Sequence, residues 1–115
     1  MREIKPNKLY KHFKGEYYFT LGVSNPVNVL NSIGKYKFIR VKNTETDEEF
    51  DVLLNLESKQ IYHNQNISGK TFVIYRNAYL NVDVIWAREI ETFSGKVDKE
   101  KYPEYEGKNR FEEVK

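Results

Sequence analysis

The sequence predicts a mainly β protein, in which five or six short strands form a small closed barrel together with a short helix. Aromatic residues make up 15% of the 115 residues, with 9 Tyr and 7 Phe, so a few large side chains can close a small core. Tyr, Phe, Val and Ile also favour strands over helices. Apolar segments of strand length recur between turn signals, a spacing typical of small barrels. The length fits a single domain over residues 1–115.

The first half of the chain predicts three strands and one helix. Residues 16–23 are aromatic and β-branched and follow a Lys-Gly turn signal, so they predict a strand. Residues 26–33 begin with Pro, precede Gly and place their apolar side chains on one helical face, which predicts about two helical turns. Residues 35–42 alternate between apolar and basic side chains, and after a polar turn residues 49–54 return as the acidic second arm of a hairpin.

The second half predicts two further strands. Residues 55–70 give no clear signal, because Asn, Gln, Ser and Gly dominate there. Residues 71–75 are continuously apolar and predict a strand buried on both faces. A loop over residues 76–81 and a strand over residues 82–86 follow, and residues 87–93 have the pattern of one helical turn. The remaining residues, 94–115, are highly charged and are expected to be held to the body by five apolar or aromatic residues: Val97, Tyr102, Pro103, Tyr105 and Phe111.

Composition excludes several classes of protein. Cysteine is absent, which removes disulfide frameworks, thiolate zinc sites and cysteine nucleophiles. The chain shows no secretory signal pattern and no apolar run of the roughly 18–20 residues that a membrane span requires. We therefore expect a cytoplasmic protein without membrane contact. The net charge of +2 is small for a protein that binds phosphate backbones, so nucleic acid is not an expected partner.

Two blocks of the sequence resemble a known family. Residues 10–15 read Tyr-Lys-His-Phe-Lys-Gly, and later come Trp86-Ala87-Arg88, Lys101-Tyr102-Pro103 and Arg110-Phe111-Glu112. Together they resemble the small bacterial and phage proteins catalogued as domain of unknown function 1653, whose members carry Tyr-x-His-(Phe/Tyr)-Lys-Gly and Trp-Val-Arg-Pro. Residues 43–46, Asn-Thr-Glu-Thr, resemble the family's Thr-Glu-Thr turn. The resemblance covers about two thirds of the chain. It implies an SH3-like barrel and brings no established activity.

The chain departs from that family in three places. Glu89 stands where the family has Pro, and residues 77–79 blur a usual Leu-Tyr pair. Residues 24–38 and 54–70 have the length and polarity of insertions into a shorter core. The resemblance therefore implies a small SH3-like barrel with a short helix and inserted segments.

The first block offers a candidate ligand-binding lip. Tyr10, His12, Phe13 and Lys14 combine aromatic faces for stacking with an imidazole and a cation for an anion. The alternative is structural: Tyr10 and Phe13 would plug the end of the barrel, and Gly15 would make the turn. The structural alternative is the stronger of the two, because aromatic side chains in small domains are core residues first.

Trp86 and Arg88 form the second candidate. Separated by one residue, they would share a face of an extended segment, where Trp and Arg stack well on a planar ligand. In the structural alternative, Trp86 is a core residue and Arg88 pairs with Glu89 or Glu91. The residues expected to contact a ligand are Tyr10, His12, Lys14, Arg76, Tyr79, Trp86 and Arg88.

Catalysis is not expected. The two histidines, His12 and His63, lie far apart in sequence, and no phosphate loop, nucleophile elbow or metal-ligand spacing accompanies them. A carboxylate pair assembled by the fold would leave no local signature. We expect a non-enzymatic module, without cofactor or metal, that binds a small anionic or nucleotide-like ligand, in one version a phage protein that sequesters a host signal. The alternative is a protein-interaction module with an SH3-like groove.

Overall fold

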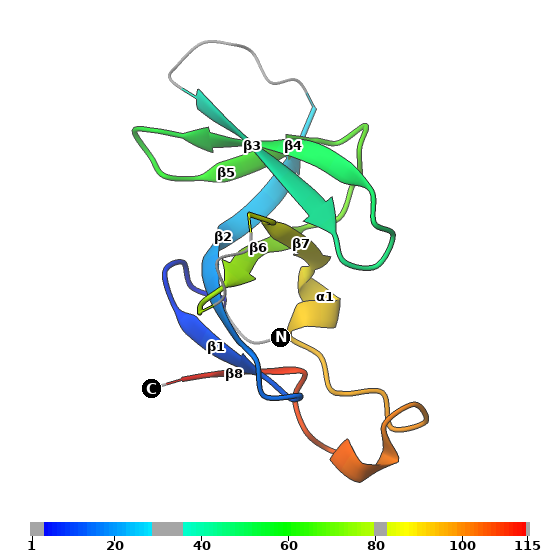
Figure 1. Ribbon diagram of the computed structural model, residues 1–115. Helices are drawn as coiled ribbons and strands as arrows, with labels where there is room; N and C mark the ends of the chain where they lie inside the picture. The colour runs from blue at the N-terminus through cyan, green and yellow to red at the C-terminus, as the bar shows by residue number, and fades with distance from the viewer. Residues whose placement is uncertain (1–3, 29–35, 80–82, 115) are drawn as a thin grey trace.

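The structure is a computed structural model, which describes residues 4–28, 36–79 and 83–114. Strands account for 49% of the described residues and helices for 7%, so the protein is mainly β (Figure 1). The elements, in chain order, are β1 (Leu9–His12), β2 (Tyr17–Val27), β3 (Tyr36–Asn43), β4 (Glu49–Asn55), β5 (Ile61–Asn64), β6 (Phe72–Asn77), β7 (Trp86–Glu89), α1 (Ile90–Phe93), the 3₁₀ turn η1 (Pro103–Tyr105) and β8 (Phe111–Glu113).

Six of these strands close into a barrel. They follow one another in the order β5-β4-β3-β7-β6-β2, and a parallel pairing between β2 and β5 joins the two ends of the row. Beyond β2 the sheet continues through β1 to β8, so the first and last strands lie side by side below the barrel (Figure 1). The closed barrel with extra strands and a short helix confirms the predicted fold class and is compatible with an SH3-like barrel.

Two clusters of buried side chains hold the molecule together. The barrel interior contains seven: Val41, Phe50, Val52, Ile61, Phe72, Ile74 and Ala87. A second cluster lies on the outer side of β6, where β1, β8 and α1 cover it: Ile4, Tyr10, Val73, Tyr75, Phe93 and Phe111. Since alternate residues of β6 enter opposite clusters, this strand is buried on both faces, which confirms the expectation from its continuous apolar run.

The long strand β2 connects the two parts. It pairs with β1 near its beginning, with β6 along its middle and with β5 at its end. A bulge at Leu21 shifts the register with β6 between Thr20 and Gly22. Gly22 has φ of +153° and faces the side chain of Ile61 so closely that a Cβ atom would lie 3.1 Å from Ile61 Cδ1. The bulge lets one strand serve both clusters.

The expected break after residue 23 and the helix from residue 26 are wrong where the structure describes them. Ser24, Asn25, Pro26 and Val27 continue β2, because β5 offers them a parallel partner that the sequence pattern did not reveal. Proline is tolerated near a strand end, where its missing N–H costs little. Residues 29–33 of the expected helix lie outside the described residues.

Other boundaries also differ. Residues 55–70, which gave no clear signal for a helix or strand, contain β5. Strand β6 extends through Arg76 and Asn77, which were expected in a loop. The strand expected over residues 82–86 begins only at Trp86, because pairing with β6 fixes it between Trp86 and Glu89. The helical turn is confirmed but starts at Ile90. The hairpin of β3 and β4 is confirmed with its charge pairing, including Arg40 Nε at 3.0 Å from an Asp51 carboxylate oxygen.

Residues 95–110 form an arm that extends away from the barrel (Figure 1). A bridge between Lys96 and Asn109 closes its base, and the backbone of Arg110 donates a hydrogen bond to the carbonyl of Gly95 (2.9 Å). Val97 is buried at this base, and Phe111 enters the second cluster just after it. Two of the five residues expected to hold the tail are therefore buried.

Candidate functional site

A cleft lies where the arm meets the second cluster. We distinguish two adjoining parts, which share His12, Thr44 and Arg88. The open half has a volume of about 490 Å³ and is lined by mostly polar side chains: Phe13, Lys14, Glu16, Glu45, Asp98, Lys101, Tyr102 and Arg110 besides the shared three. The aromatic half has a volume of about 210 Å³ and adds Tyr18, Asp47, Tyr75, Trp86 and Phe111.

Arg88 stands where the two halves join. In β7 the side chain of Ala87 enters the barrel interior, so Trp86 and Arg88 share the opposite face, as their spacing predicted. Arg88 Nε donates a hydrogen bond to Thr44 Oγ1 (2.9 Å) and lies 3.8 Å from a carboxylate oxygen of Glu45. Only 16% of its side chain is exposed. The carboxylate near Arg88 is thus Glu45 from the β3–β4 loop, and not Glu89 or Glu91 as the structural alternative had it.

Three more cations face the open half: Lys14, Lys101 and Arg110. Among the described residues, no carboxylate oxygen comes within 4.0 Å of any of the three. Arg110 instead donates from Nε to the carbonyl of Thr92 (3.2 Å), and burial together with the nearby Arg88 lowers its pKa. Lys14 Nζ lies 4.8 Å from the centre of the Tyr102 ring, and a hydrogen bond from Lys14 lowers the pKa of the Tyr102 hydroxyl.

His12 is neutral at pH 7. Burial, as the largest cause, and the nearby cations Arg88, Arg110 and Lys14 together lower its pKa to about 4, against partial opposition from Glu16. Its Nδ1 accepts a hydrogen bond from the backbone N–H of Lys14 (3.2 Å), so the ring proton of the neutral form is on Nε2. The ring packs against Phe13 at a centroid distance of 4.4 Å. His12 therefore adds a donor to the cleft without adding a positive charge.

The aromatic half contains two tyrosines, Tyr18 and Tyr75, whose hydroxyl groups stay protonated. Burial and the neighbouring Glu16 raise the pKa of Tyr18 to about 12, and its hydroxyl donates to a Glu16 carboxylate oxygen (3.1 Å). Burial also raises the pKa of Tyr75, whose hydroxyl interacts with Thr44 and Arg88. Trp86 packs against the second cluster and remains partly exposed toward this half.

The structure brings four of the seven expected site residues into this cleft: His12, Lys14, Trp86 and Arg88. Tyr10 lies elsewhere, because it is 2% exposed and packs edge-on against Phe93 in the second cluster. It is a core residue, as the structural alternative proposed.

Arg76 and Tyr79 also lie outside the cleft. Arg76 is exposed on β6 opposite Phe19, and Tyr79 is 72% exposed and contacts Tyr17. Neither lines either half, and both follow the part of β6 that pairs with β7, which ends at Tyr75.

Sequence reasoning missed most of the residues that line the cleft, among them four that the proposals below use or that lie beside its cations: Thr44, Lys101, Tyr102 and Arg110. All four stand in segments that carry the family resemblance, so a signal was present. It did not predict a site because more than half of the chain separates Thr44 from Arg110, and only the fold brings these residues together.

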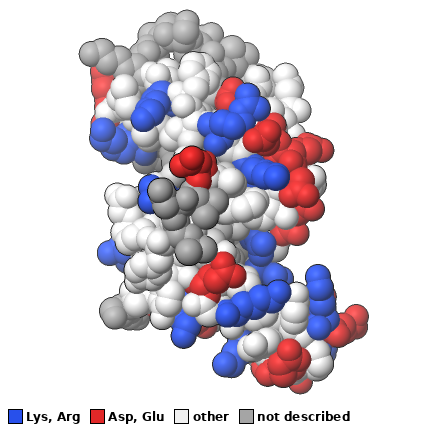
Figure 2. Space-filling view, viewed as in Figure 1, with Lys and Arg blue, Asp and Glu red and all other residues white. Residues whose placement is uncertain are grey.

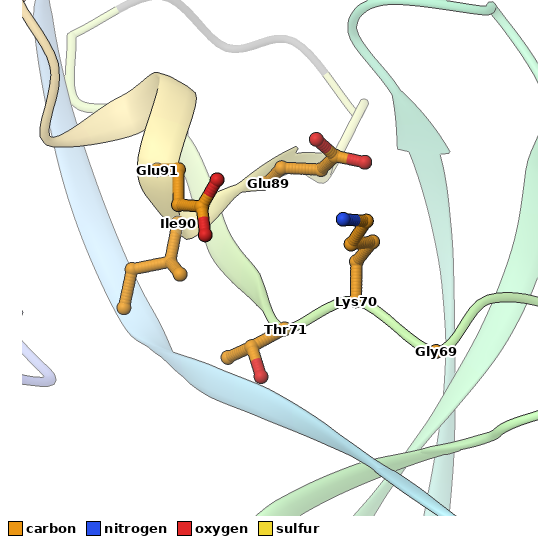
Figure 3. Close-up of a pocket in the computed structure, with 6 residues that line it drawn as sticks. All are labelled: Gly69, Lys70, Thr71, Glu89, Ile90 and Glu91. Carbon is orange, nitrogen blue, oxygen red and sulfur yellow. The ribbon is translucent and has the colours of Figure 1, made fainter.

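A second pocket, of about 420 Å³, lies beside α1 on the other side of β7. Figure 3 shows Lys70 directed toward Glu89, with Glu91 on the adjacent turn of α1 and Thr71 next to Lys70 in the segment that leads into β6. Lys70 and Glu91 are exposed to solvent, which weakens any charge they would present to a ligand. Residues 4–28, 36–79 and 83–114 contain no group of three or more His, Asp or Glu that could hold a metal ion.

His63 is a structural residue. It is fully buried in the barrel, where Nε2 donates to the carbonyl of Ser68 (3.0 Å) and Nδ1 accepts from the hydroxyl of Ser24 (2.8 Å). This pair spans the β2–β5 contact that closes the barrel. With no exposed surface at either residue, His63 and Ser24 have no access to a substrate.

No protein-family model, curated protein or solved structure matches this chain. The resemblance to domain of unknown function 1653 therefore stays a prediction. No helix in the described part of the chain is long and apolar enough to cross a membrane. On the face drawn in Figure 2, basic side chains are scattered and form no continuous basic surface, and acidic side chains gather along its right edge.

Proposed function

We propose that the protein is a binding module for a small anion, which occupies the open half of the cleft. The observation that carries this proposal is the group of four cations, Lys14, Arg88, Lys101 and Arg110, against three carboxylates in the same space. Three of these cations have no carboxylate within 4.0 Å among the described residues. Arg88 and Arg110 are partly buried, and partly desolvated cations gain most from an anion that completes their hydrogen bonds, whereas Lys14 and Lys101 are exposed and contribute less. A nucleotide-like anion is the class that the sequence favoured.

Binding rather than catalysis is the activity we propose for this cleft. The hydrogen bond that His12 accepts comes from backbone, so His12 does not activate a nucleophile through that nitrogen. A protein that only binds its ligand, including one that sequesters a signal, releases the ligand chemically unchanged. Incubation with a mixture of nucleotides, followed by denaturation and mass spectrometry, should recover every bound compound intact. Recovery of a hydrolysed or transferred product would show an enzyme instead.

Calorimetric titration with phosphate, pyrophosphate and nucleotides at low and moderate salt tests the binding itself. Arg110→Gln should lower the affinity for the anion that binds best by about tenfold or more, since charge-assisted hydrogen bonds contribute about 1.5–3 kcal/mol. Arg76→Gln is the matched control, because Arg76 is exposed and outside the cleft. If the wild type binds none of these anions, or both variants bind as the wild type does, the proposed function is wrong.

A protein-interaction module is the second candidate, and the edge of β3 favours it. Along residues 36–41, β3 pairs only with β4 within the described part of the chain, and Phe38 on this strand is 67% exposed. Such an edge can accept an extended peptide as an additional strand. Capture of a stoichiometric protein by the wild type, its loss in Phe38→Asp and its retention in Arg110→Gln would favour this candidate over anion binding.

A further inference from the structure

The two halves of the cleft differ in chemistry and are continuous. Cations and carboxylates line the open half, whereas four aromatic rings line the aromatic half: Tyr18, Tyr75, Trp86 and Phe111. A simple anion such as phosphate would use only the open half. The aromatic half then has no role in the proposed function, although it opens directly beside the cations through three shared residues.

We propose that the ligand is a small organic anion that also carries a planar aromatic ring, the class to which mononucleotides belong. The anionic group would lie in the open half, and the ring would lie in the aromatic half against Trp86. This inference rests on the proposed function, because it names the ligand class of the same cleft.

Arg88 is the residue that can contact both the anionic group and the planar ring of such a ligand. Its Nε is occupied by Thr44 Oγ1 (2.9 Å), and its guanidinium carbon lies 5.8 Å from the centre of the Phe111 ring. The guanidinium thus lies over the Phe111 ring while Arg88 lines both halves. A planar cation in this position can bind an anionic group with its N–H donors and stack a ring on its face.

The polar groups of the aromatic half suit the edge of a heteroaromatic ring. Thr44, Asp47 and the hydroxyl of Tyr75 stand among the rings and supply both donors and acceptors. Because the pKa values of Tyr18 and Tyr75 are raised, both phenols keep their protons and repel no ligand charge. Mixed linings of this kind, mostly apolar with a few oriented polar groups, are typical of ligand pockets.

Trp86 gives a direct readout, because it is the only tryptophan in the chain. The five common nucleoside monophosphates and phenyl phosphate supply rings with an anion, and ribose 5-phosphate supplies the anion without a ring. We expect at least one ring-bearing phosphate to change the fluorescence of Trp86 and to bind about tenfold tighter than ribose 5-phosphate. A tenfold difference corresponds to about 1.4 kcal/mol, within the range for stacking of one base on an aromatic side chain.

Trp86→Leu should remove that tenfold advantage and leave the affinity for ribose 5-phosphate unchanged in calorimetry. The fluorescence of the wild type tests the proposal independently, should the variant fold poorly. If ribose 5-phosphate binds as tightly as every ring-bearing phosphate and Trp86 fluorescence stays constant, the inference is overturned while anion binding stands. If none of the phosphates binds, the proposed function fails, and this inference fails with it.

Discussion

The hydrogen bond from Arg88 Nε to Thr44 Oγ1, 2.9 Å long, joins β7 to the β3–β4 loop at the centre of the cleft. The two residues are 44 positions apart, and both line the open and the aromatic half. Arg88 is largely buried, so the hydroxyl of Thr44 is a main partner that replaces water for its charge.

Thr44→Val keeps the shape of the side chain and removes this acceptor. We expect the free energy of unfolding to fall by about 1–2 kcal/mol, because a charged donor in a partly buried position loses a hydrogen bond. Urea denaturation monitored by Trp86 fluorescence measures the change. Thr44→Ser is the matched control and should lie within about 0.5 kcal/mol of the wild type. Equal midpoints for Thr44→Val and Thr44→Ser would show that the hydroxyl does not stabilise Arg88.

Stability should depend on pH through His12. Its pKa is about 4 in the folded protein and about 6.5 in the unfolded chain, so the unfolded chain binds more protons between these values. The contribution to stability is therefore complete above pH 6.5 and is lost as the pH falls to 4, by up to about 3 kcal/mol.

Denaturation curves at pH 7.5, 6, 5 and 4 for the wild type and His12→Asn measure this contribution. The difference in stability between the two proteins should narrow by that amount as the pH falls. His63 is present in both proteins, and because burial also lowers its pKa, its own loss of stability at low pH cancels in the difference. A difference that stays constant from pH 7.5 to 4 would contradict the assignment of a depressed pKa to His12.

Trp86 and Arg88 should both matter for stability, for different reasons. Trp86 is partly exposed and packs against the second cluster, so Trp86→Ala should cost about 2–4 kcal/mol, somewhat less than a fully buried aromatic. Arg88→Ala should cost about 1–3 kcal/mol through the lost hydrogen bond and packing. Arg76→Ala, at the exposed position of β6, is the control and should change stability by less than about 0.5 kcal/mol. Circular dichroism during thermal unfolding avoids dependence on the tryptophan signal.

Gly22 should resist substitution. A side chain at this position would be strained at φ of +153° and would press on Ile61, so Gly22→Ala should destabilise the protein by about 1–3 kcal/mol. Gly69→Ala is the control, because that residue has ordinary backbone angles and open space around it. It should be neutral or stabilising by a few tenths of a kcal/mol. A tolerated Gly22→Ala would mean that the bulge in β2 relaxes without cost.

Local sequence patterns predicted the elements that carry their own signal. The alternation in β3 and β4, the apolar run of β6 and the face shared by Trp86 and Arg88 all follow from neighbouring residues. Pairings between distant segments left no such signal. The β2–β5 contact turned an expected helix start into strand, and the register with β6 moved β7 from its expected position.

Among the residues of the candidate site, too, local sequence predicted some, and contacts between distant segments bring in the others. His12, Lys14, Trp86 and Arg88 were found because aromatic and basic residues stand close together in sequence. Arg110 and Lys101 were not predicted, since they reach the cleft only through the arm and the pairing of β8 with β1. Tyr10 could not be assigned to core or site from its type alone, because a tyrosine serves equally well in both.

The pairing of β1 with β8 has a consequence for how the protein folds. Tyr10 lies opposite Glu113, so this contact closes a loop of almost the entire chain, and contacts of such separation are characteristic of slow folding. The cleft lacks Arg110 and Phe111 until that step is complete. A ligand of the cleft would then bind the native state and not the transition state for folding. In stopped-flow experiments it should slow unfolding and leave the rate of folding unchanged.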